Sequence, residues 1–308
     1  MCIRDRYRTD PYESWIDRVT GLRLIAIHAH PDDESSKGAA TMAKYAAEGN
    51  RVKVVTCTDG RRGDVLNPAM DRPGVLDNIL EVRREEMARA AAALGVEHVW
   101  LGYEDSGLPE GDPLPPLPEG SFAVQDPEEV AVKIVEQIRE FRPHVIITYD
   151  ENGGYPHPDH LMVHAISMIA WERAGDPDFA PGTGEPWTPL KLYYSHGFIL
   201  QRMKLLQERL IQRGKQSPYE LMIKRWEENE GDVFGRVTTQ VECAGYFQQR
   251  AEALTAHATQ IDPAGAFLAS PVEDQQDVWP TEEFELAASR VETTLPETDL
   301  FAGTEEEN

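Results

Sequence analysis

The sequence predicts an α/β protein: a Rossmann-like, mostly parallel sheet with helices on both faces, plus a smaller, mainly helical C-terminal portion. Short apolar runs rich in β-branched residues alternate with helical segments over the first 190 residues, and strands joined by helical crossovers pair in parallel. The chain has 308 residues, of which 41% are hydrophobic, and this is enough for one large core.

The predicted elements follow one another in β-then-α order. Strands are expected at residues 22–28, 52–58, 98–101, 145–149 and 191–194. Helices are expected at residues 37–48 and 77–94, which Gly49 and Gly95 end, at 127–141 with an early proline, and from about 159 to 174. The polar stretch 59–73 and the Pro-rich stretch 108–118 are predicted to be exposed loops.

The C-terminal part has weaker patterns. Residues 195–259 are predicted to be mostly helical, and the acidic chain from Gln260 onwards is predicted to be loosely held. We therefore expect residues 22–190 to form the main domain, and residues 191–303 to complete it and cover its pocket. Residues 1–21 and 304–308 are expected to be poorly structured, and residues 1–6 share no pattern with the rest of the chain.

Composition restricts the partners and the chemistry. A formal charge of −24 argues against nucleic acid or an anionic membrane as a partner, since phosphate groups are bound by basic surfaces. The three cysteines are too few and too scattered for a disulfide framework or a thiolate metal site, so a metal would need histidine and carboxylate ligands. With no run of about 20 apolar residues, we expect a cytoplasmic protein with no obligate protein partner.

The first polar motif, His30-Pro-Asp-Asp33, follows the first predicted strand. Successive side chains diverge, so one of Asp32 and Asp33 is expected to bind a metal while the other faces water. Which carboxylate does which is open at this point. The ordinary alternative is that one of them caps the following helix.

The second motif, Tyr155-Pro-His-Pro-Asp-His160, follows the fourth predicted strand, so both motifs are expected at the same sheet edge. Here Asp159 is expected to cap the next helix, with His160 in its first turn. Two histidines and one aspartate would leave zinc a fourth, water-filled position, as in catalytic zinc sites. The alternative is a surface histidine pair in a turn. His28 lies on the same strand face as His30, and we expect it to pack near the strand end.

Together, Ala29-His-Pro-Asp-Asp-Glu34 and Pro156-His-Pro-Asp-His160 resemble the motifs of the LmbE-like, or PIG-L, zinc N-deacetylases. The pair is specific, since both motifs occur in this order and each follows a predicted strand. Longer stretches at residues 28–38, 66–73, 105–116 and 149–160 are similar to family members that act on S-conjugates of mycothiol. The similarity runs from about residue 22 to residue 303.

The resemblance implies a role for each motif residue. One zinc ion would be held by His30, Asp33 and His160, and Asp32 would be the general base. Tyr155 corresponds to a mobile tyrosine that hydrogen-bonds the oxyanion, and a ring packed on the preceding Gly-Gly turn is its ordinary alternative. His157 corresponds to a histidine that assists the tetrahedral intermediate or the leaving amine.

The resemblance also implies substrate contacts by Lys37, Arg83 and Asp105. Arg83 corresponds to an arginine that binds sugar or inositol hydroxyls, although an ion pair with Glu86 on the helix surface is the ordinary alternative. Lys37 corresponds to a lysine that separates the conjugate amidases from simpler deacetylases, and the alternative is a solvated residue at a helix start. Residues 58–63 depart from the family's Gly-Gly-Glu-Arg-Gly pattern.

The implied activity is zinc-dependent hydrolysis of the amide bond in mycothiol S-conjugates, a thiol-based detoxification that gives glucosaminyl-inositol and an N-acetylcysteine S-conjugate. The second reading is a deacetylase of N-acetylglucosaminyl-inositol with a smaller acyl pocket. Residues 108–118 and 183–187 are candidates for lining the roomier pocket of an amidase. A third reading is a non-catalytic carbohydrate-binding α/β module, although no Gly-x-Gly-x-x-Gly loop follows the first strand.

Overall fold

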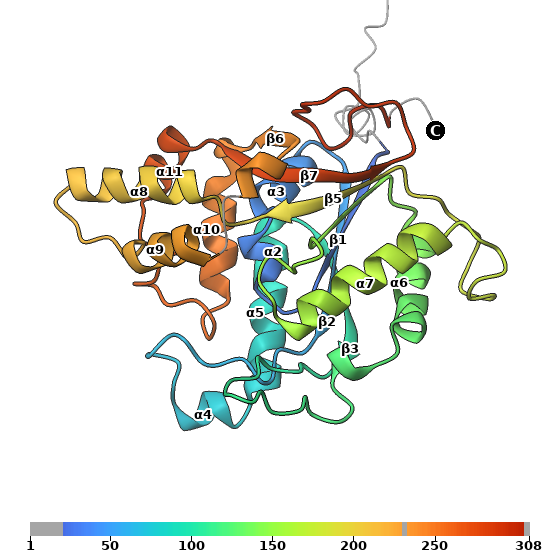
Figure 1. Ribbon diagram of the computed structural model, residues 1–308, viewed down its shortest axis with the longest axis horizontal. Coiled ribbons are helices and arrows are strands. Elements are labelled where there is room, and N and C mark those ends of the chain that lie inside the picture. Colours follow the sequence, from blue (N-terminus) through green and yellow to red (C-terminus); the bar gives the residue numbers. More distant parts are fainter. Residues whose placement is uncertain (1–20, 230–232, 305–308) are drawn as a thin grey trace, which may run out of the picture.

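A computed structural model of the chain describes residues 21–229 and 233–304, and shows one seven-stranded sheet in the order β3-β2-β1-β4-β5-β7-β6 (Figure 1). The first five strands pair in parallel, and the last two are antiparallel. The strands are β1 (Arg23–His28), β2 (Arg51–Thr58), β3 (Glu97–Tyr103), β4 (Val145–Thr148), β5 (Lys191–His196), β6 (Thr239–Glu242) and β7 (Thr281–Ser289). The α/β prediction is confirmed.

Helices cover both faces of the sheet because its strands are apolar on both sides. Ile25 and Ile27 of β1 belong to the core under α6 and α7, whereas Leu24 and Ala26 belong to the core under α3 and α5 (Figure 1). The helices are α2 (Asp33–Ser36), α3 (Ala39–Ala47), α4 (Pro73–Leu76), α5 (Ile79–Leu94), α6 (Pro127–Phe141), α7 (Pro158–Arg173), α8 (Leu200–Gln212), α9 (Glu220–Asn229), α10 (Phe247–Ala256) and α11 (Val272–Val278). No helix in the described part is long and apolar enough to cross a membrane.

The order and direction of the strands bring the two polar motifs to the same edge of the sheet. From β1 the sheet grows outwards through β2 and β3, and the chain then returns to add β4 on the other side of β1. Open α/β sheets bind ligands at such a switch point, outside the carboxyl ends of the strands. Residues 30–33 follow β1 and residues 155–160 follow β4, so both motifs lie there.

The predicted helix at residues 37–48 starts too early. A short helix, α2, ends at Ser36, Lys37 is extended, and Gly38 has a positive φ of 81° before α3 begins at Ala39. Glycine adopts this conformation without the strain that a side chain would bring. The break matters because it removes Lys37 from the predicted solvated helix start and leaves it buried beside Asp33.

The acidic C-terminal part is not loosely held over residues 260–304, and residues 239–242 are a strand rather than helix. β7 lies between β5 and β6 in the sheet, so residues beyond 190 add three strands to the sheet that β1–β4 begin. Its Glu282 is buried because it accepts the N–H groups of Ala40 and Thr41, in the first turn of α3 (3.2 and 2.8 Å), and pairs with Arg250 (3.2 Å). The expected poorly structured ends lie almost entirely outside the described residues.

Candidate functional site

His160 presents an unused ring nitrogen to the switch point. Its Nδ1 lies 2.8 Å from the carbonyl oxygen of Gly153, an acceptor, so Nδ1 carries the proton and Nε2 carries a lone pair. This Nε2 is buried without a hydrogen-bond partner, 3.4 Å from Oδ2 of Asp33. Glycine at position 153 permits the approach, because a Cβ there would lie 2.7 Å from the Cβ of His160.

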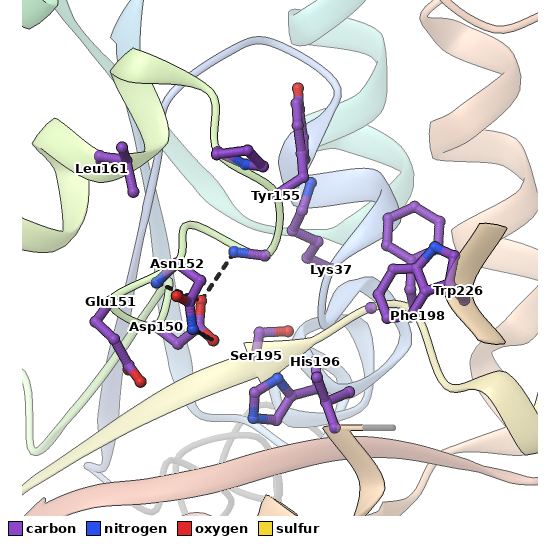
Figure 2. A pocket seen from close by; sticks show the side chains of 14 residues that line it. Lys37, Asp150, Glu151, Asn152, Tyr155, Leu161, Ser195, His196, Phe198 and Trp226 are labelled. Atoms are coloured by element: carbon purple, nitrogen blue, oxygen red, sulfur yellow. Dashed lines mark hydrogen bonds between the residues drawn. The ribbon is translucent and has the colours of Figure 1, made fainter. Parts of the chain in front are cut away.

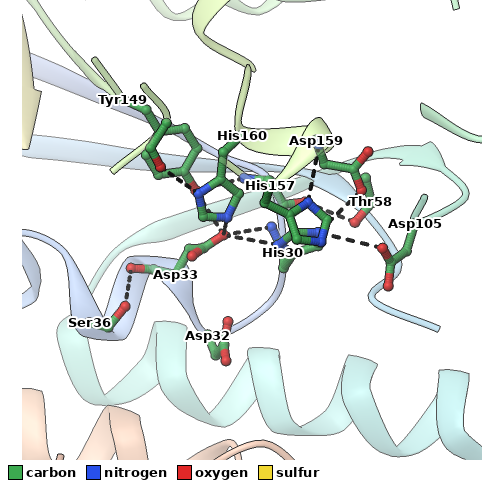
Figure 3. A network of polar contacts seen from close by, with 12 residues as sticks. His30, Asp32, Asp33, Ser36, Thr58, Asp105, Tyr149, His157, Asp159 and His160 are labelled. Carbon is green, nitrogen blue, oxygen red and sulfur yellow. Dashed lines mark hydrogen bonds and ion pairs between the residues drawn. The ribbon is translucent and has the colours of Figure 1, made fainter. Parts of the chain in front are cut away.

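One ring nitrogen of His30 is likewise held by an oxygen acceptor, here a carboxylate. Its Nε2 lies 3.2 Å from Oδ2 of Asp159, and its Nδ1 lies 3.4 Å from Oδ2 of Asp33 (Figure 3). A histidine whose far nitrogen is held by a carboxylate is typical of metal ligands. His30, Asp33 and His160 therefore turn three donor atoms towards one another, all within 4.8 Å, and they can hold a metal ion.

The Asp33 carboxylate is kept ionised and fixed in place. Lys37 donates to its Oδ1 at 2.5 Å, and the Tyr149 hydroxyl donates to its Oδ2 at 2.7 Å. Burial acts to raise the pKa of this carboxyl, but the positive charge of Lys37 and the contact with the His160 ring hold it well below its usual range. Tyr149 also accepts the N–H of Ala29 at 3.0 Å, which links the first motif to the end of β4.

A second group of possible ligands, His30, Asp105, His157 and Asp159, shares His30 with the first. Most of its polar atoms already have partners: Asp159 Oδ2 accepts from the Ser106 N–H (2.9 Å), and both Asp105 oxygens accept backbone N–H groups. Of the two groups, only the first contains a buried ring nitrogen without a partner in the described part of the chain. The first group is therefore the better candidate for holding a metal ion.

Asp32 points away from that group. Its φ of 122° is rare for a residue with a side chain, and such strain is typical of functional sites. The carboxylate makes no capping hydrogen bond to α2 and instead borders the cavity in front of His30, so the capping alternative is wrong. Burial, followed by repulsion from Asp33, raises the pKa of Asp32 to about 7, which suits a group that exchanges protons near neutral pH.

Tyr155 and His157 lie beside the metal group. The Tyr155 ring contacts the His160 ring edge-on at 4.7 Å, so it does not simply pack on the glycine turn. Burial and the nearby carboxylates raise the pKa of Tyr155, so its hydroxyl stays protonated and can donate. Burial also lowers the pKa of His157 to about 4, and its Nδ1 accepts the N–H of Asp159 at 3.1 Å. His157 is thus a neutral ring whose proton is on Nε2.

These residues border a cavity of about 680 Å³, here called the metal cavity, which is within the usual size range of ligand sites. It is lined by residues from both motifs, from the loops at 60–66 and 105–110, and from the C-terminal part. A neighbouring side cavity of about 600 Å³ shares Lys37, Tyr155 and Phe198 with it. Figure 2 shows Glu151 and Asn152 on one side of this side cavity and Phe198 and Trp226 on the other, with Lys37 and Tyr155 between them.

Of the three residues expected to contact substrate, two line the metal cavity and one does not. Lys37 and Asp105 line the metal cavity, although Asp105 already accepts backbone N–H groups from Arg62 and Gly107. Arg83 is 0% exposed and does not line that cavity. It donates to the carbonyl oxygens of Gly63 and Asp64 (2.7 and 3.3 Å), so the ordinary alternative of a surface ion pair with Glu86 is wrong.

Two residues that support the metal group are not identified by sequence reasoning. Asp159 is expected to cap α7, but the cap is His157, and the Asp159 carboxylate instead holds His30. Tyr149 has no predicted role beyond the end of a strand. A signal for Asp159 exists, because a carboxylate next to a predicted histidine ligand is a common partner of such ligands.

Two other expectations can be compared with the positions of the side chains: His28 packs near the strand end as expected, whereas residues 183–187 do not line the pocket. His28 is buried against Tyr149, with ring centroids 5.7 Å apart, and belongs to neither group of possible ligands. Trp187 donates its indole N–H to the carbonyl oxygen of Pro143, just before β4, so residues 183–187 lie at the opposite end of the sheet from the site. Of the two loops expected to line an acyl pocket, only 108–118 reaches the metal cavity, through Leu108 and Glu110.

Comparison with known proteins finds relatives over almost the whole chain. A model of the PIG-L family, described as GlcNAc-PI de-N-acetylase, matches residues 25–171, which include both motifs. The mycothiol S-conjugate amidase of Streptomyces coelicolor is 58% identical over 285 residues, covering 92% of this chain and 97% of the relative. A 1D-myo-inositol 2-acetamido-2-deoxy-alpha-D-glucopyranoside deacetylase of Streptomyces scabiei is 40% identical, with coverage of 92% and 90%.

The fold also occurs among solved structures. The N,N'-diacetylchitobiose deacetylase from Pyrococcus horikoshii matches with a TM-score of 0.57 and 15% sequence identity. The match covers 91% of this chain and 94% of that one. At this level of identity, the likeness concerns the fold alone.

Proposed function

Since the chain belongs to the PIG-L family, as its two motifs predicted, we propose that it is a zinc-dependent amidase that cleaves mycothiol S-conjugates. The products would be glucosaminyl-inositol and an N-acetylcysteine S-conjugate. Membership makes the chain an enzyme of the amidase and deacetylase class. The observation that carries the reaction type is the buried, unpartnered Nε2 of His160, which faces a carboxylate oxygen shared with His30.

The donor set suits zinc. Two imidazole nitrogens and one carboxylate oxygen are the ligands of many catalytic zinc sites, which keep a fourth position open. When bound by His30, Asp33 and His160, zinc would polarise the amide carbonyl and make a water molecule more acidic. All three ligands are already oriented by partners behind them, so binding would require little rearrangement.

The proposed catalytic steps use residues that border the metal cavity. Asp32 accepts a proton from the attacking water, and its raised pKa matches this role near neutral pH. The Tyr155 hydroxyl and the Nε2–H of His157 donate to the oxygen that gains charge in the transition state. Asp32 then returns its proton to the glucosaminyl nitrogen, so the amine leaves in neutral form.

The choice of substrate rests on the Streptomyces coelicolor relative, which is 58% identical to this chain, whereas the Streptomyces scabiei deacetylase is 40% identical. Lys37 corresponds to the lysine that separates conjugate amidases from simpler deacetylases, and its position in the lining of the metal cavity supports this choice. We further propose that the enzyme acts in the cytoplasm on this small-molecule conjugate, without a macromolecular partner.

We expect the purified enzyme to cleave a mycothiol–bimane adduct faster than it deacetylates N-acetylglucosaminyl-inositol. Product release measured by chromatography for both substrates tests the proposal. Removal of metal with a chelator should abolish both reactions, and added zinc should restore them. An adduct that stays intact with zinc-loaded enzyme, while acetate is released, would favour the deacetylase reading instead.

Replacing Tyr155 by phenylalanine is expected to lower kcat by about 10²-fold or more, because one donor to the developing oxyanion is lost. KM should change little, since the ring and its contact with His160 remain. Steady-state kinetics with a measured zinc content check this. A normal kcat in the variant would exclude Tyr155 from the oxyanion site.

A further inference from the structure

An apolar cavity of about 330 Å³ adjoins the metal cavity, and the catalytic steps do not use it. The two cavities share Ser36, Leu66, Phe198, Gln260 and Phe267 as lining residues. The helix α2 borders both: Asp33 at its start lines the metal cavity, and Ser36, one helical turn later, lines both cavities. A group bound there would therefore lie next to the scissile amide.

The walls of this cavity come mainly from the C-terminal part. Met203 and Leu206 of α8, Met222 of α9, and Leu254 of α10 face it, together with Ala266 and Phe267 from the loop before α11. Methionine side chains are flexible and polarisable, and surfaces that accept varied apolar partners are often rich in them. The lining thus fits an apolar group whose shape varies.

The two arginines at this cavity do not make it an anion site. Arg202 pairs with Glu283 at 3.2 Å, and Arg250 pairs with Glu282 at 3.2 Å. Both carboxylates are buried in β7. Each positive charge is therefore balanced by a negative charge behind it, and the cavity attracts an uncharged group.

We infer that the apolar cavity binds the S-linked substituent of the conjugate, and this inference rests on the proposed function. In such a substrate the sulfur is about three covalent bonds from the carbonyl carbon, and the hydroxyl-rich glucosaminyl-inositol lies on the other side of the amide. The metal cavity, with Arg62, Asp64 and Glu110, has polar groups for the hydroxyls. In a conjugate with an aromatic or alkyl S-substituent, this substituent is the largest apolar part. Phe198 borders both cavities and marks the passage between them.

The size of the cavity fits this occupant. Cavities of about 150 Å³ with apolar walls bind benzene, so 330 Å³ accepts one aromatic group with room to spare. Large S-substituents should therefore contribute to binding rather than obstruct it. A smaller cavity should therefore lower kcat/KM for conjugates with a bulky S-substituent and leave kcat/KM for small conjugates unchanged.

The test compares S-benzyl and S-methyl conjugates of mycothiol as substrates. Met222→Trp and, from the facing loop, Ala266→Leu each fill part of the apolar cavity. We expect each variant to lower the ratio of kcat/KM for S-benzyl over S-methyl by about 10-fold or more. Leu221→Trp is the matched control, because Leu221 precedes Met222 on α9 and is 80% exposed, and its ratio should equal that of the unchanged enzyme.

The outcomes separate the inference from the function on which it rests. Cleavage of the S-methyl conjugate at the unchanged rate shows that a variant is folded and active. An unchanged benzyl-to-methyl ratio in both filled variants would overturn the inference while leaving the amidase proposal intact. Failure of the unchanged enzyme to cleave either conjugate would overturn the proposed function itself.

Discussion

His160→Ala is expected to release the metal and to lower amide hydrolysis by about 10³- to 10⁴-fold, the largest effect that we predict. The variant removes the ring nitrogen that has no partner in the protein, and only His30 and Asp33 remain as donors. Loss of the metal removes several kcal/mol of transition-state stabilisation, and each 1.36 kcal/mol corresponds to about a factor of ten in rate.

Metal content after dialysis, measured together with turnover, checks this expectation. His164→Ala is the matched control, because His164 lies one turn later on α7 and belongs to neither group of possible ligands. Its ring lies against the Tyr149 carbonyl oxygen and the Tyr194 ring instead. The control should keep its metal and most of its activity. If His160→Ala retained a full equivalent of metal, the assignment of the ligands would be wrong.

Asp32→Asn is expected to lower kcat by about 10²- to 10⁴-fold while the metal stays bound, since the amide cannot accept the proton of the attacking water. Asp33→Asn changes the neighbouring carboxylate in the same way, but it should lose the metal because Asp33 Oδ2 is the oxygen that both histidines face. The two adjacent variants therefore separate proton transfer from metal binding. Equal metal loss in both would contradict the division of roles.

The pH dependence of kcat/KM tests the same base. Asp32 must be ionised to accept a proton, and burial followed by repulsion from Asp33 raises its pKa to about 7. The rate of the unchanged enzyme should therefore fall as the pH drops through this region, at or somewhat below about pH 7 because a bound cation favours the ionised form. The Asp32→Asn variant should show a much weaker fall on the acid side.

Local sequence patterns are sufficient for the parallel half of the sheet. The strands β1, β2 and β4 are short runs of buried apolar residues, and α6 has its predicted bounds because a proline begins it and an apolar face continues to Phe141. Chain order then places residues 30–33 and 155–160 at one sheet edge, since parallel strands all end on the same side. These inferences need only periodicity and chain direction.

Local sequence patterns do not predict a segment correctly when it is stabilised by contacts that the pattern itself does not encode. β7 has the composition of an acidic tail, yet Glu282 is buried because it satisfies the N–H groups at the start of α3 and pairs with Arg250. Lys37 has the sequence context of a solvated residue at a helix start, yet the positive φ at Gly38 turns the chain so that its amine reaches Asp33. Neither partnership has a signature within the segment itself.

The same division holds for the site. Two histidines and an aspartate that follow two strands of one sheet are enough to predict a metal-binding hydrolase, because the two strands end at the same sheet edge. The choice of Asp33 rather than Asp32 as a ligand came from the family resemblance. Only the tertiary structure shows that Asp159 and Tyr149 hold His30 and Asp33, that Arg83 is buried behind the loop at residues 60–64, and that the C-terminal helices build an apolar cavity beside the metal cavity. Contacts between residues far apart in the chain depend on how helices and strands pack, and apart from the position of Asp159 beside a predicted histidine ligand, the local sequence does not indicate them.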